Sequence, residues 1–192
     1  MIRMDIDETL VLARNTVRIR RSEVDDAERT LAAVRASMTE LARWTPWAHP
    51  DYSLEDARIW LELCAEGWDK GTQYSFVAAD IATGEVLGDC SISQINRMHG
   101  FANLGYWVRS TATGQGLGSA LARRVARFGI EALQLNRLEI LTSVGNRASQ
   151  RVAEKAGATR EGVLRSRLIL REEIQDALLF SLTARDFGKE PS

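Results

Sequence analysis

The fold is decided by the stretch YWVRSTATGQGLGSA, residues 106–120, in which an apolar strand ends, three alternate glycines follow and a helix begins. Gly114, Gly116 and Gly118 allow the backbone to turn tightly and to approach a ligand closely. The free N–H groups at the start of a helix attract anions. We therefore expect a phosphate or pyrophosphate group to bind at residues 115–119. The alternative is a tight turn between strand and helix that binds no ligand.

Two common phosphate-binding motifs do not describe this turn. A Walker A loop requires a lysine followed by Ser or Thr after its second glycine, and no such lysine occurs here. The dinucleotide fingerprint GxGxxG fails because Ser119 stands where its third glycine would be. An antiparallel meander precedes the turn, whereas a dinucleotide-binding unit needs parallel strands.

The residues on either side of the turn alternate between strand and helix patterns. Alternating apolar and polar residues predict strands, and apolar residues at helical spacing predict helices. The predicted strands cover residues 16–21, 73–80, 85–95, 101–108, 138–144, 159–170 and 174–183. The predicted helices cover residues 27–41, after a capping-box-like start at Ser22 and Asp25, and 53–68, 117–135 and 146–156. The order β-α-α-β-β-β-α-β-α-β-β predicts a mixed α/β fold with a mostly antiparallel central sheet and helices on both faces.

Length and composition are those of one globular domain. A chain of 192 residues, 45% hydrophobic and 27% charged, can bury a core without disulfides. We expect a single domain over residues 1–192, with an N-terminal arm at 1–15 and a tail at 188–192.

Charge and residue usage exclude several classes of partner. Lys and Arg number 25 and Asp and Glu 26, which gives a net charge of −1, so we expect neither nucleic acid nor membrane as a partner. We find no targeting or membrane-spanning segment and expect a cytoplasmic protein. Two cysteines without CxxC spacing and two histidines argue against a zinc site, so we expect no metal.

Several motifs together resemble one family. Residues 113–118, TGQGLG, resemble the Q/R-x-x-G-x-G/A acyl-CoA signature of the GNAT acetyltransferase superfamily. Residues 146–149, NRAS, and 154–158, EKAGA, are similar to the N-x-x-S and E-K-x-G-F segment of that superfamily. Residues 161–165, EGVLR, and Asp176 resemble the branch that contains the ribosomal-protein N-terminal (alanine) acetyltransferases. Thr113 and Ala158 depart from the usual residues, but the element order also matches, so the resemblance spans residues 16–187.

The resemblance implies that acetyl-CoA is the co-substrate and lies between two diverging strands. Its pantetheine arm would hydrogen-bond the backbone of Trp107 and Val108, where strand 101–108 splays from strand 138–144. Its pyrophosphate would accept hydrogen bonds from five backbone N–H groups, those of Gln115, Gly116, Leu117, Gly118 and Ser119. Arg123 and Arg124, one turn later, could reach the nucleotide phosphates or form only a solvated helix face.

The resemblance also implies roles for two residues at the start of helix 146–156. Asn146 would contact the cofactor arm, although an Asn before a helix is also an ordinary N-cap. Ser149 would lie near the thiol and protonate the departing thiolate, which makes it the candidate catalytic residue. Tyr106 could point into the same pocket or pack in the core.

A base that accepts the proton of the amine is harder to identify. Some GNAT enzymes place a glutamate where this chain has Ala102 or Asn103. The remaining candidates are Asp89, Ser91 and Ser93 in strand 85–95, and Glu161, which could instead pair with an arginine at the surface. Neither Cys64 nor Cys90 has the basic neighbours of an activated thiolate, so we expect direct attack by the amine rather than an acyl-enzyme.

The acceptor site and assembly are expectations of the resemblance as well. Trp44 and Trp47, beside two prolines, would flank the acceptor groove, and Ser91 would line it. We expect an N-acetyltransferase that acetylates a primary amine, either a protein N-terminus or a small molecule. The alternatives are a non-catalytic acyl-CoA-binding or regulatory module on the same fold, and a nucleotide-binding protein. The apolar hairpin at residues 159–183 favours a homodimer.

Overall fold

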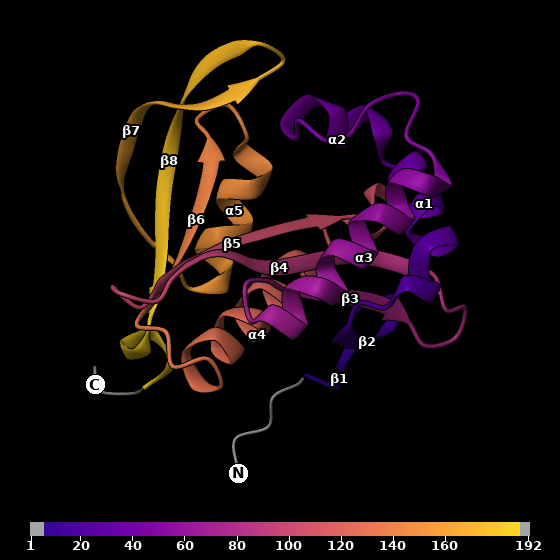
Figure 1. Cartoon of the computed structure of the whole chain (residues 1–192), viewed down its shortest axis with the longest axis horizontal. Coiled ribbons are helices and arrows are strands. Elements are labelled where there is room, and N and C mark those ends of the chain that lie inside the picture. Colours follow the sequence, from indigo (N-terminus) through magenta and orange to yellow (C-terminus); the bar gives the residue numbers. More distant parts are fainter. Residues whose placement is uncertain (1–5, 189–192) are drawn as a thin grey trace.

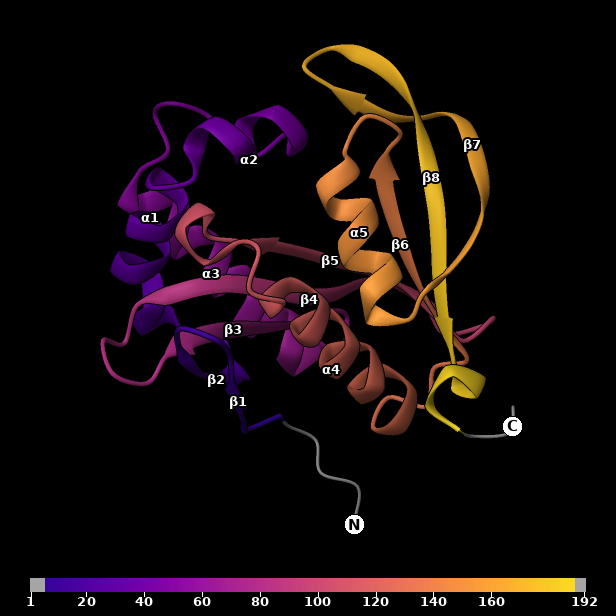
Figure 2. The same ribbon diagram turned by 180° about the vertical axis from the view of Figure 1, so that it is seen from behind.

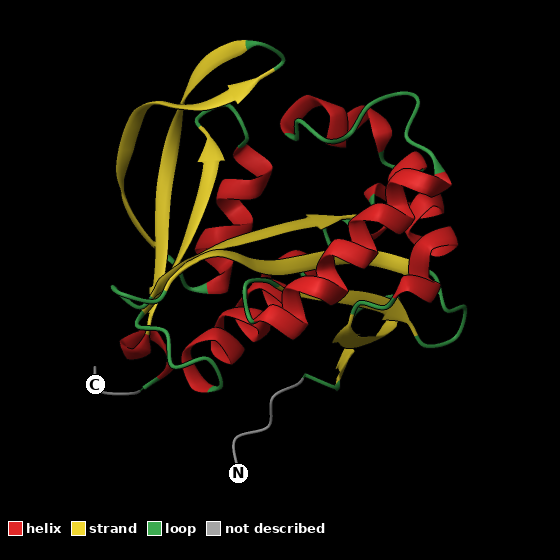
Figure 3. Ribbon diagram, in the orientation of Figure 1, coloured by secondary structure: helices red, strands yellow, loops and turns green. Residues whose placement is uncertain are grey.

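The computed structural model describes residues 6–188, in which eight strands form one sheet in the order β1-β2-β3-β4-β5-β6-β8-β7 (Figures 1 and 3). The strands are β1 (Glu8–Val11), β2 (Thr16–Arg21), β3 (Tyr74–Asp80), β4 (Val86–Asn96), β5 (Phe101–Val108), β6 (Arg137–Ser143), β7 (Thr159–Leu170) and β8 (Glu173–Thr183). The helices are α1 (Ala27–Arg35), α2 (Met38–Trp44), α3 (Leu54–Lys70), α4 (Leu117–Glu131) and α5 (Arg147–Ala156), with short 3-10 turns at Val24–Asp26, Ser110–Ala112 and Ala184–Phe187. The mixed α/β class and the mostly antiparallel sheet are confirmed.

Helices cover both faces of the sheet. In Figure 1 α3 crosses in front of β3 and β4, and in Figure 2, seen from behind, α4 crosses the same strands. The buried apolar residues form two clusters: one joins α4 and α5 to the sheet, and a smaller one lies among α1, α2, α3 and the loop that follows α2. Side chains of β5 alternate between these clusters, so that Tyr106 packs against the first and Trp107 against the second.

The strands β5 and β6 form the only parallel pair among the described residues, and they pair over a short length. Residues 101–103 lie opposite residues 137–139, and no pairing continues beyond them. The remainder of β5 therefore diverges from β6, and the sheet opens between these strands towards the carboxyl end of each. This geometry agrees with the predicted splay and places Trp107 and Val108 on its edge.

The N-terminal arm is not wholly without structure, which corrects one expectation. Its residues 8–11 form β1, an edge strand that pairs antiparallel with β2. These four residues alternate between half-buried and exposed positions, and their sequence has too little apolar pattern to predict a strand. These residues form a strand because their backbone pairs with β2, and the local sequence does not show that pairing. The proposed tail, apart from Gly188, lies outside the described residues.

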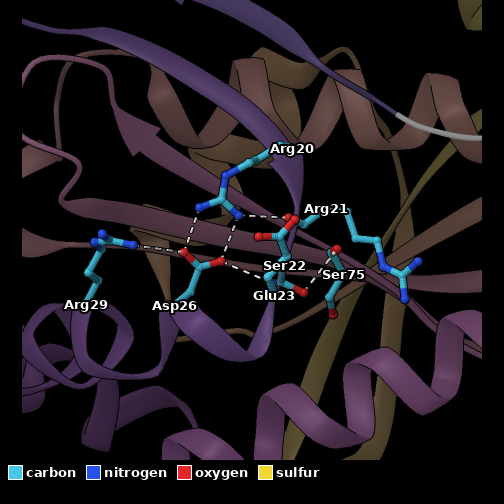
Figure 4. Close-up of polar contacts among 7 residues, drawn as sticks. All are labelled: Arg20, Arg21, Ser22, Glu23, Asp26, Arg29 and Ser75. Carbon is cyan, nitrogen blue, oxygen red and sulfur yellow. Dashed lines mark hydrogen bonds and ion pairs between the residues drawn. The ribbon is translucent and has the colours of Figure 1, made fainter.

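The first predicted helix is interrupted, and its capping box lies one residue later than expected, although α1 begins at Ala27 as predicted. The capping box joins Glu23 and Asp26 rather than Ser22 and Asp25. Figure 4 shows why Asp26 takes this position: Arg20 of β2 donates two hydrogen bonds to its carboxylate, at 2.7 and 2.6 Å. The helix then breaks at Ser37, whose Oγ donates to the carbonyl of Ala33 and accepts from the backbone N–H of Ser110. The end of α1 thus depends on a contact between Ser37 and Ser110, 73 positions away, which the spacing of apolar residues could not predict.

The hairpin of β7 and β8 exposes fewer apolar residues than its sequence suggested. Leu170, Leu178 and Phe180 are buried. Ile169 and Ile174, by contrast, are 67% and 69% exposed near the turn. The turn itself uses left-handed backbone at Arg171 and Glu172, which suits a tight two-residue connection.

Candidate active site

The glycine-rich turn presents free backbone N–H groups to an open space. Gly114 and Gly116 have φ of 77° and 85°, values that favour glycine, and a Cβ atom built on either would meet nothing within 4 Å. Gly116 is the N-cap of α4, and the first intrahelical hydrogen bond runs from Ala120 N–H to the Gly116 carbonyl. The N–H groups of Leu117, Gly118 and Ser119 therefore have no helical acceptor, and no acidic residue lies in this first turn. Such a cradle fits a phosphate or pyrophosphate.

Gly118 has a packing role rather than a conformational one. A Cβ atom there would lie 3.2 Å from methyl groups of both Val108 and Val152. The bare backbone lets α4 approach β5 and α5 closely, which brings the start of α4 to the mouth of the opening between β5 and β6.

The two arginines that follow the turn are held by protein groups. Arg123 donates to the carbonyls of Ala156 and Asp186, at 2.9 and 3.0 Å. Arg124 forms an ion pair with Glu8, at 2.6 Å. Both contacts orient the guanidinium groups towards neighbouring elements. These arginines therefore bind protein groups rather than the nucleotide phosphates that they could have reached.

Tyr106 and Ser149 meet beside the opening. The Tyr106 hydroxyl lies 3.1 Å from Ser149 Oγ and donates a 2.9 Å hydrogen bond to the Ser149 carbonyl. Burial raises the pKa of Tyr106 far above its ordinary value, although the hydrogen bond to Ser149 opposes that shift. The phenol therefore stays protonated at neutral pH. The sequence did not decide whether Tyr106 lies in the core or in the pocket. The alternation of a strand cannot show that Ser149 of α5 lies beside this residue.

Asn146 is the N-cap of α5. Its side-chain oxygen accepts from the backbone N–H of Ser149, at 3.0 Å, which satisfies one free donor of the helix. The contact fixes the backbone of Ser149 and leaves the serine hydroxyl to Tyr106. The ordinary capping role is thus present, and it positions the candidate catalytic serine.

A cavity of about 290 Å³ lies on the opposite face of β5, among α1, α3 and the loop after α2. Asp89 of β4, which pairs with Trp107 of β5, lines it together with Thr30. Asp89 is 6% exposed, and no hydrogen bond or ion pair joins its side chain to any of residues 6–188. Burial alone raises the pKa of this carboxyl to about 7. The Thr30 hydroxyl is also buried without a hydrogen-bond partner there.

Aromatic rings form much of the cavity wall. The rings of Trp47 and Trp107 lie 6.3 Å apart, and those of Trp47 and Tyr52 lie 5.9 Å apart. Trp60 of α3 lines the same space. The sequence did not indicate Trp60 or Tyr52 as site residues, because aromatic residues in a helix or loop pattern usually pack in the core.

Some residues singled out from the sequence lie elsewhere. Trp44 packs over Gly145, at the loop between β6 and α5, and lines a separate groove beside the β7–β8 turn rather than this cavity. Ser91 lies on the same face of β4 as Asp89, opposite Gly105, but does not line the cavity. Glu161 accepts two hydrogen bonds from Arg137, at 2.6 and 2.5 Å, which confirms the surface pairing considered for it.

The position of the family glutamate holds no carboxylate. Ala102 is fully buried and pairs with Leu138, and Asn103 lies opposite Ser93 on the face of β5 that carries Trp107. Both cysteines are buried, and burial raises the pKa of Cys64 to about 12 and that of Cys90 well above its ordinary value. Residues 6–188 contain no group of three or more His, Cys, Asp and Glu side chains arranged to hold a metal ion. Over the same residues no helix is long and apolar enough to cross a membrane.

Known proteins share both the sequence pattern and the fold. A model of the acetyltransferase (GNAT) domain matches residues 16–159. The chain is 28% identical over 178 residues to a putative ribosomal N-acetyltransferase, YdaF of Bacillus subtilis, covering 91% of this chain and 94% of that protein. Its fold matches the ribosomal-protein-S5-alanine acetyltransferase of Vibrio fischeri, with a TM-score of 0.82, 20% identity and 92% and 97% of the two chains covered. It also matches Mycobacterium smegmatis RimJ in complex with CoA-disulfide, with a TM-score of 0.81, 24% identity and 96% and 90% covered. The chain therefore belongs to the GNAT acetyltransferase domain family.

Proposed function

We propose that this acetyltransferase transfers an acetyl group from acetyl-CoA to a primary amine, which attacks the thioester directly while both substrates are bound. The observation that carries the proposal is the juxtaposition of two features. The free N–H groups of Gly116 to Ser119 lie at one end of the opening between β5 and β6, and the hydroxyl pair of Tyr106 and Ser149 lies beside that opening.

The cofactor would lie along this opening. The N–H groups of Gln115, Gly116, Leu117, Gly118 and Ser119 would bind the pyrophosphate, as a helix start binds anions generally. Trp107 and Val108 pair with β4 on one side, and on the side that faces the opening they would hydrogen-bond the pantetheine arm in place of a strand. This arrangement would bring the thioester to the hydroxyl pair.

The hydroxyl pair would serve the leaving group. Attack by the amine forms a C–N bond, the C–S bond then breaks, and the thiolate takes a proton. Ser149 or Tyr106 would supply that proton, and the 3.1 Å contact between their oxygens would let one replenish the other. The start of α5 adds a field that favours the developing negative charge.

We propose a protein N-terminus as the acceptor, with a small amine as the alternative. The support is the similarity to proteins named for ribosomal substrates, among them the ribosomal-protein-serine acetyltransferase of Escherichia coli, 28% identical over 97 residues. A spermidine N-acetyltransferase of Vibrio cholerae shares the fold, with a TM-score of 0.73 and 17% identity, so the fold itself does not decide between the two classes.

A screen of acceptors tests the function. Purified protein and acetyl-CoA are incubated with small amines and with peptides that carry free or blocked N-termini, and released thiol is measured. The proposal expects thiol release that depends on a free amine, with mass spectrometry placing the acetyl group on that amine. Acetyl-CoA that raises the melting temperature without any turnover across the panel would instead support a non-catalytic acyl-CoA-binding module.

We also propose a cytoplasmic location, where acetyl-CoA and ribosomal proteins are found, and a homodimer. The support for assembly is the edge position of β7 and the exposed Ile169 and Ile174 near its turn. Light scattering at micromolar concentration would measure the mass directly, and a monomer throughout would contradict the dimer.

A further inference from the structure

We propose that the cavity above Asp89 recognises the acceptor, with the Asp89 carboxylate binding its ammonium group and the aromatic wall selecting one small apolar or aromatic group attached to that amine. This inference deepens the proposed function, on which it rests, and names the substrate class. A simple arylalkylamine and a peptide whose first residue is apolar both have this chemistry, and the experiment below distinguishes them.

An unpartnered buried carboxylate is the first reason. Asp89 is 6% exposed and has no hydrogen bond or ion pair through its side chain within residues 6–188. Taking a carboxylate out of water without a partner is costly, so such groups are found paired or neutral. None of the described residues uses this side chain as a hydrogen-bond or ion-pair partner, and the cavity gives a ligand access to it.

Among residues 6–188, no Lys or Arg lines the cavity and could pair with Asp89 in place of a ligand. The titratable groups that line the cavity are His49 and Tyr52 of the loop, and Asp56 of α3, while Cys64 of α3 and Cys90 of β4 lie close enough to feel its charge. A cation that arrives from outside would therefore meet one buried negative charge that is free to pair with it.

The wall of the cavity favours the same ligand. Trp47, Tyr52, Trp60 and Trp107 offer aromatic faces, which attract cations and pack well on apolar groups. A volume of about 290 Å³ is close to the smallest small-molecule sites, which have about 300 Å³. The space suits one residue-sized group beside the ammonium and disfavours a long chain with several charges.

Position connects the cavity to the reaction. Trp107 lines the cavity with its ring, while its backbone borders the opening between β5 and β6. An amine bound at Asp89 would therefore lie beside the strand residue that also borders the proposed thioester position. Ile59 and Leu63 of α3, 46% and 52% exposed, form an apolar rim through which a ligand could enter.

The proton balance follows from this placement. The bound ammonium gives one proton to the Asp89 carboxylate, and the neutral amine uses its lone pair to attack the thioester carbon. As the C–S bond breaks, the hydroxyl pair gives a proton to the thiolate, and the second proton of the nitrogen restores the hydroxyl pair. The amide leaves, and Asp89 releases its proton to solvent, so that one proton appears for each acetyl transferred.

The test compares a charged ligand with a neutral one of similar shape. It also compares a variant that loses a carboxylate inside the cavity with a variant that loses one outside it. Wild-type protein is titrated with 2-phenylethylamine and with 2-phenylethanol, its neutral counterpart, and melting temperature and thiol release are measured. Tripeptides with N-terminal Phe, free or acetylated, and spermidine complete the panel. Asp89→Asn and Thr30→Val alter the cavity, and Glu62→Gln removes a carboxylate from the exposed side of α3 as the matched control.

The proposal expects binding of the amine but not of the alcohol, and a loss of about a hundredfold in kcat/KM for Asp89→Asn, since it removes one partner of a buried charge pair. Acetyl-CoA affinity should be unchanged, and Glu62→Gln should stay within about twofold of wild type because exposed charges contribute little. In wild type kcat/KM should rise with pH as Asp89 ionises near pH 7, and that step should be absent in Asp89→Asn. Thr30→Val should weaken amine binding even if Asp89→Asn does not fold.

The outcomes separate this inference from the proposed function. Equal binding of amine and alcohol, or unchanged kcat/KM in Asp89→Asn, would overturn the role of Asp89 while leaving acetyl transfer intact. Preference for spermidine over the arylalkylamine and the peptide would overturn the substrate class. Selective amine binding that Asp89→Asn abolishes, without any turnover, would support the site and reject catalysis. Acetylation of the free peptide alone, or of the arylalkylamine alone, identifies the source of the amine.

Discussion

The two faces of β5 are built in opposite ways. On one face Tyr106 meets Ser149 of α5, and their hydroxyls and the Ser149 carbonyl satisfy one another. On the other face Trp107 lies beside Asp89, whose carboxylate has no partner within residues 6–188. Neighbouring residues of a single strand thus border one polar site that is complete and one that is not.

The difference indicates which groups the protein provides and which it leaves to a ligand. A leaving thiolate needs a donor already in place, because the charge develops only during the reaction. An incoming ammonium brings its own donors and charge, so an unpaired acceptor favours it. The face with the unpaired Asp89, here called the incomplete face, should therefore lower the stability of the folded protein and contribute to binding of the amine. The face with the hydroxyl pair of Tyr106 and Ser149, the complete face, should affect the rate of acetyl transfer.

The largest expected effect concerns Asp89 and the dependence of stability on pH. Its pKa is about 7 in the folded protein against 3.8 ordinarily, so the folded state holds the proton more tightly. The free energy of unfolding should therefore fall as pH rises from about 4 to about 7, by about 4 kcal/mol in all. Asp89→Asn cannot ionise, so its stability should match wild type near pH 4 and exceed it by up to that amount at pH 8.

Urea unfolding at pH 4.5, 6 and 8 without ligand measures this difference. Glu62→Gln, which removes an exposed carboxylate from α3, should follow wild type at each pH. An Asn variant less stable than wild type at pH 8 would show that Asp89 has a stabilising partner when the protein is folded, contrary to the contrast between the two faces.

The second effect tests the anion-binding turn at the end of β5. Gly116→Asp places a negative charge beside the proposed pyrophosphate, and we expect acetyl-CoA affinity to fall about a hundredfold, as charge repulsion across an interface costs several kcal/mol. Calorimetric titration of acetyl-CoA measures the loss. Gly84→Asp makes the same change at a glycine with φ of 71° in the turn between β3 and β4, and it controls for backbone strain. Equal loss in both variants, or none in Gly116→Asp, would reject the turn as the cofactor site.

The sequence predicted the complete face better than the incomplete one. Gly114, Gly116 and Gly118 follow one another along the chain, so their local pattern indicated an anion-binding turn. Asn146 and Ser149 share a helix start and were identified through the resemblance to the GNAT family. The strand β5, the helix α4 and their order also followed from local patterns. The meeting of Tyr106 with Ser149, by contrast, joins residues 43 positions apart and required the structure.

The incomplete face could be predicted only in outline. Asp89 was one of several candidate bases, because sequence shows neither burial nor the absence of a partner. The resemblance to the GNAT family implied that Trp44 and Trp47 flank the acceptor groove. Trp47 lines the cavity beside Asp89, whereas Trp44 packs over Gly145. The break at Ser37 and the pairing of β1 escaped prediction for the same reason, since each depends on a distant segment.

The third effect belongs to the hydroxyl pair. Ser149→Ala should lower kcat about ten- to thirtyfold, which corresponds to 1–2 kcal/mol, less than the loss of an oxyanion donor because a thiolate is a good leaving group. Acetyl-CoA affinity should be nearly unchanged, as for an interaction made mainly in the transition state. The N-cap of α5 should survive, because it uses the backbone N–H of Ser149.

Tyr106→Phe tests whether the Tyr106 and Ser149 hydroxyls act together on the leaving thiolate or whether Ser149 alone donates the proton. If the hydroxyls act as a pair, the double variant should lose little more activity than either single variant. Rates are measured with saturating amine below the melting temperature of each variant, and Thr9→Ala, which removes an exposed hydroxyl from β1, is the control. A loss of stability with wild-type kcat in Ser149→Ala would remove this serine from the mechanism.

The smallest expected effect is on the two cysteines, and it tests whether attack is direct. Burial raises the pKa of Cys64 to about 12 and that of Cys90 well above its ordinary value, so neither thiol is a nucleophile at neutral pH. Cys64 also contacts Ser75 and Gln73 at 3.2 and 3.3 Å, which gives it a structural role. The double variant Cys64→Ala, Cys90→Ala should keep kcat within about twofold, although the lost packing should lower its stability by about 1–2 kcal/mol. An acetyl adduct on either cysteine in wild type, together with loss of turnover in the double variant, would require an acyl-enzyme and would give the two faces of β5 successive rather than simultaneous roles.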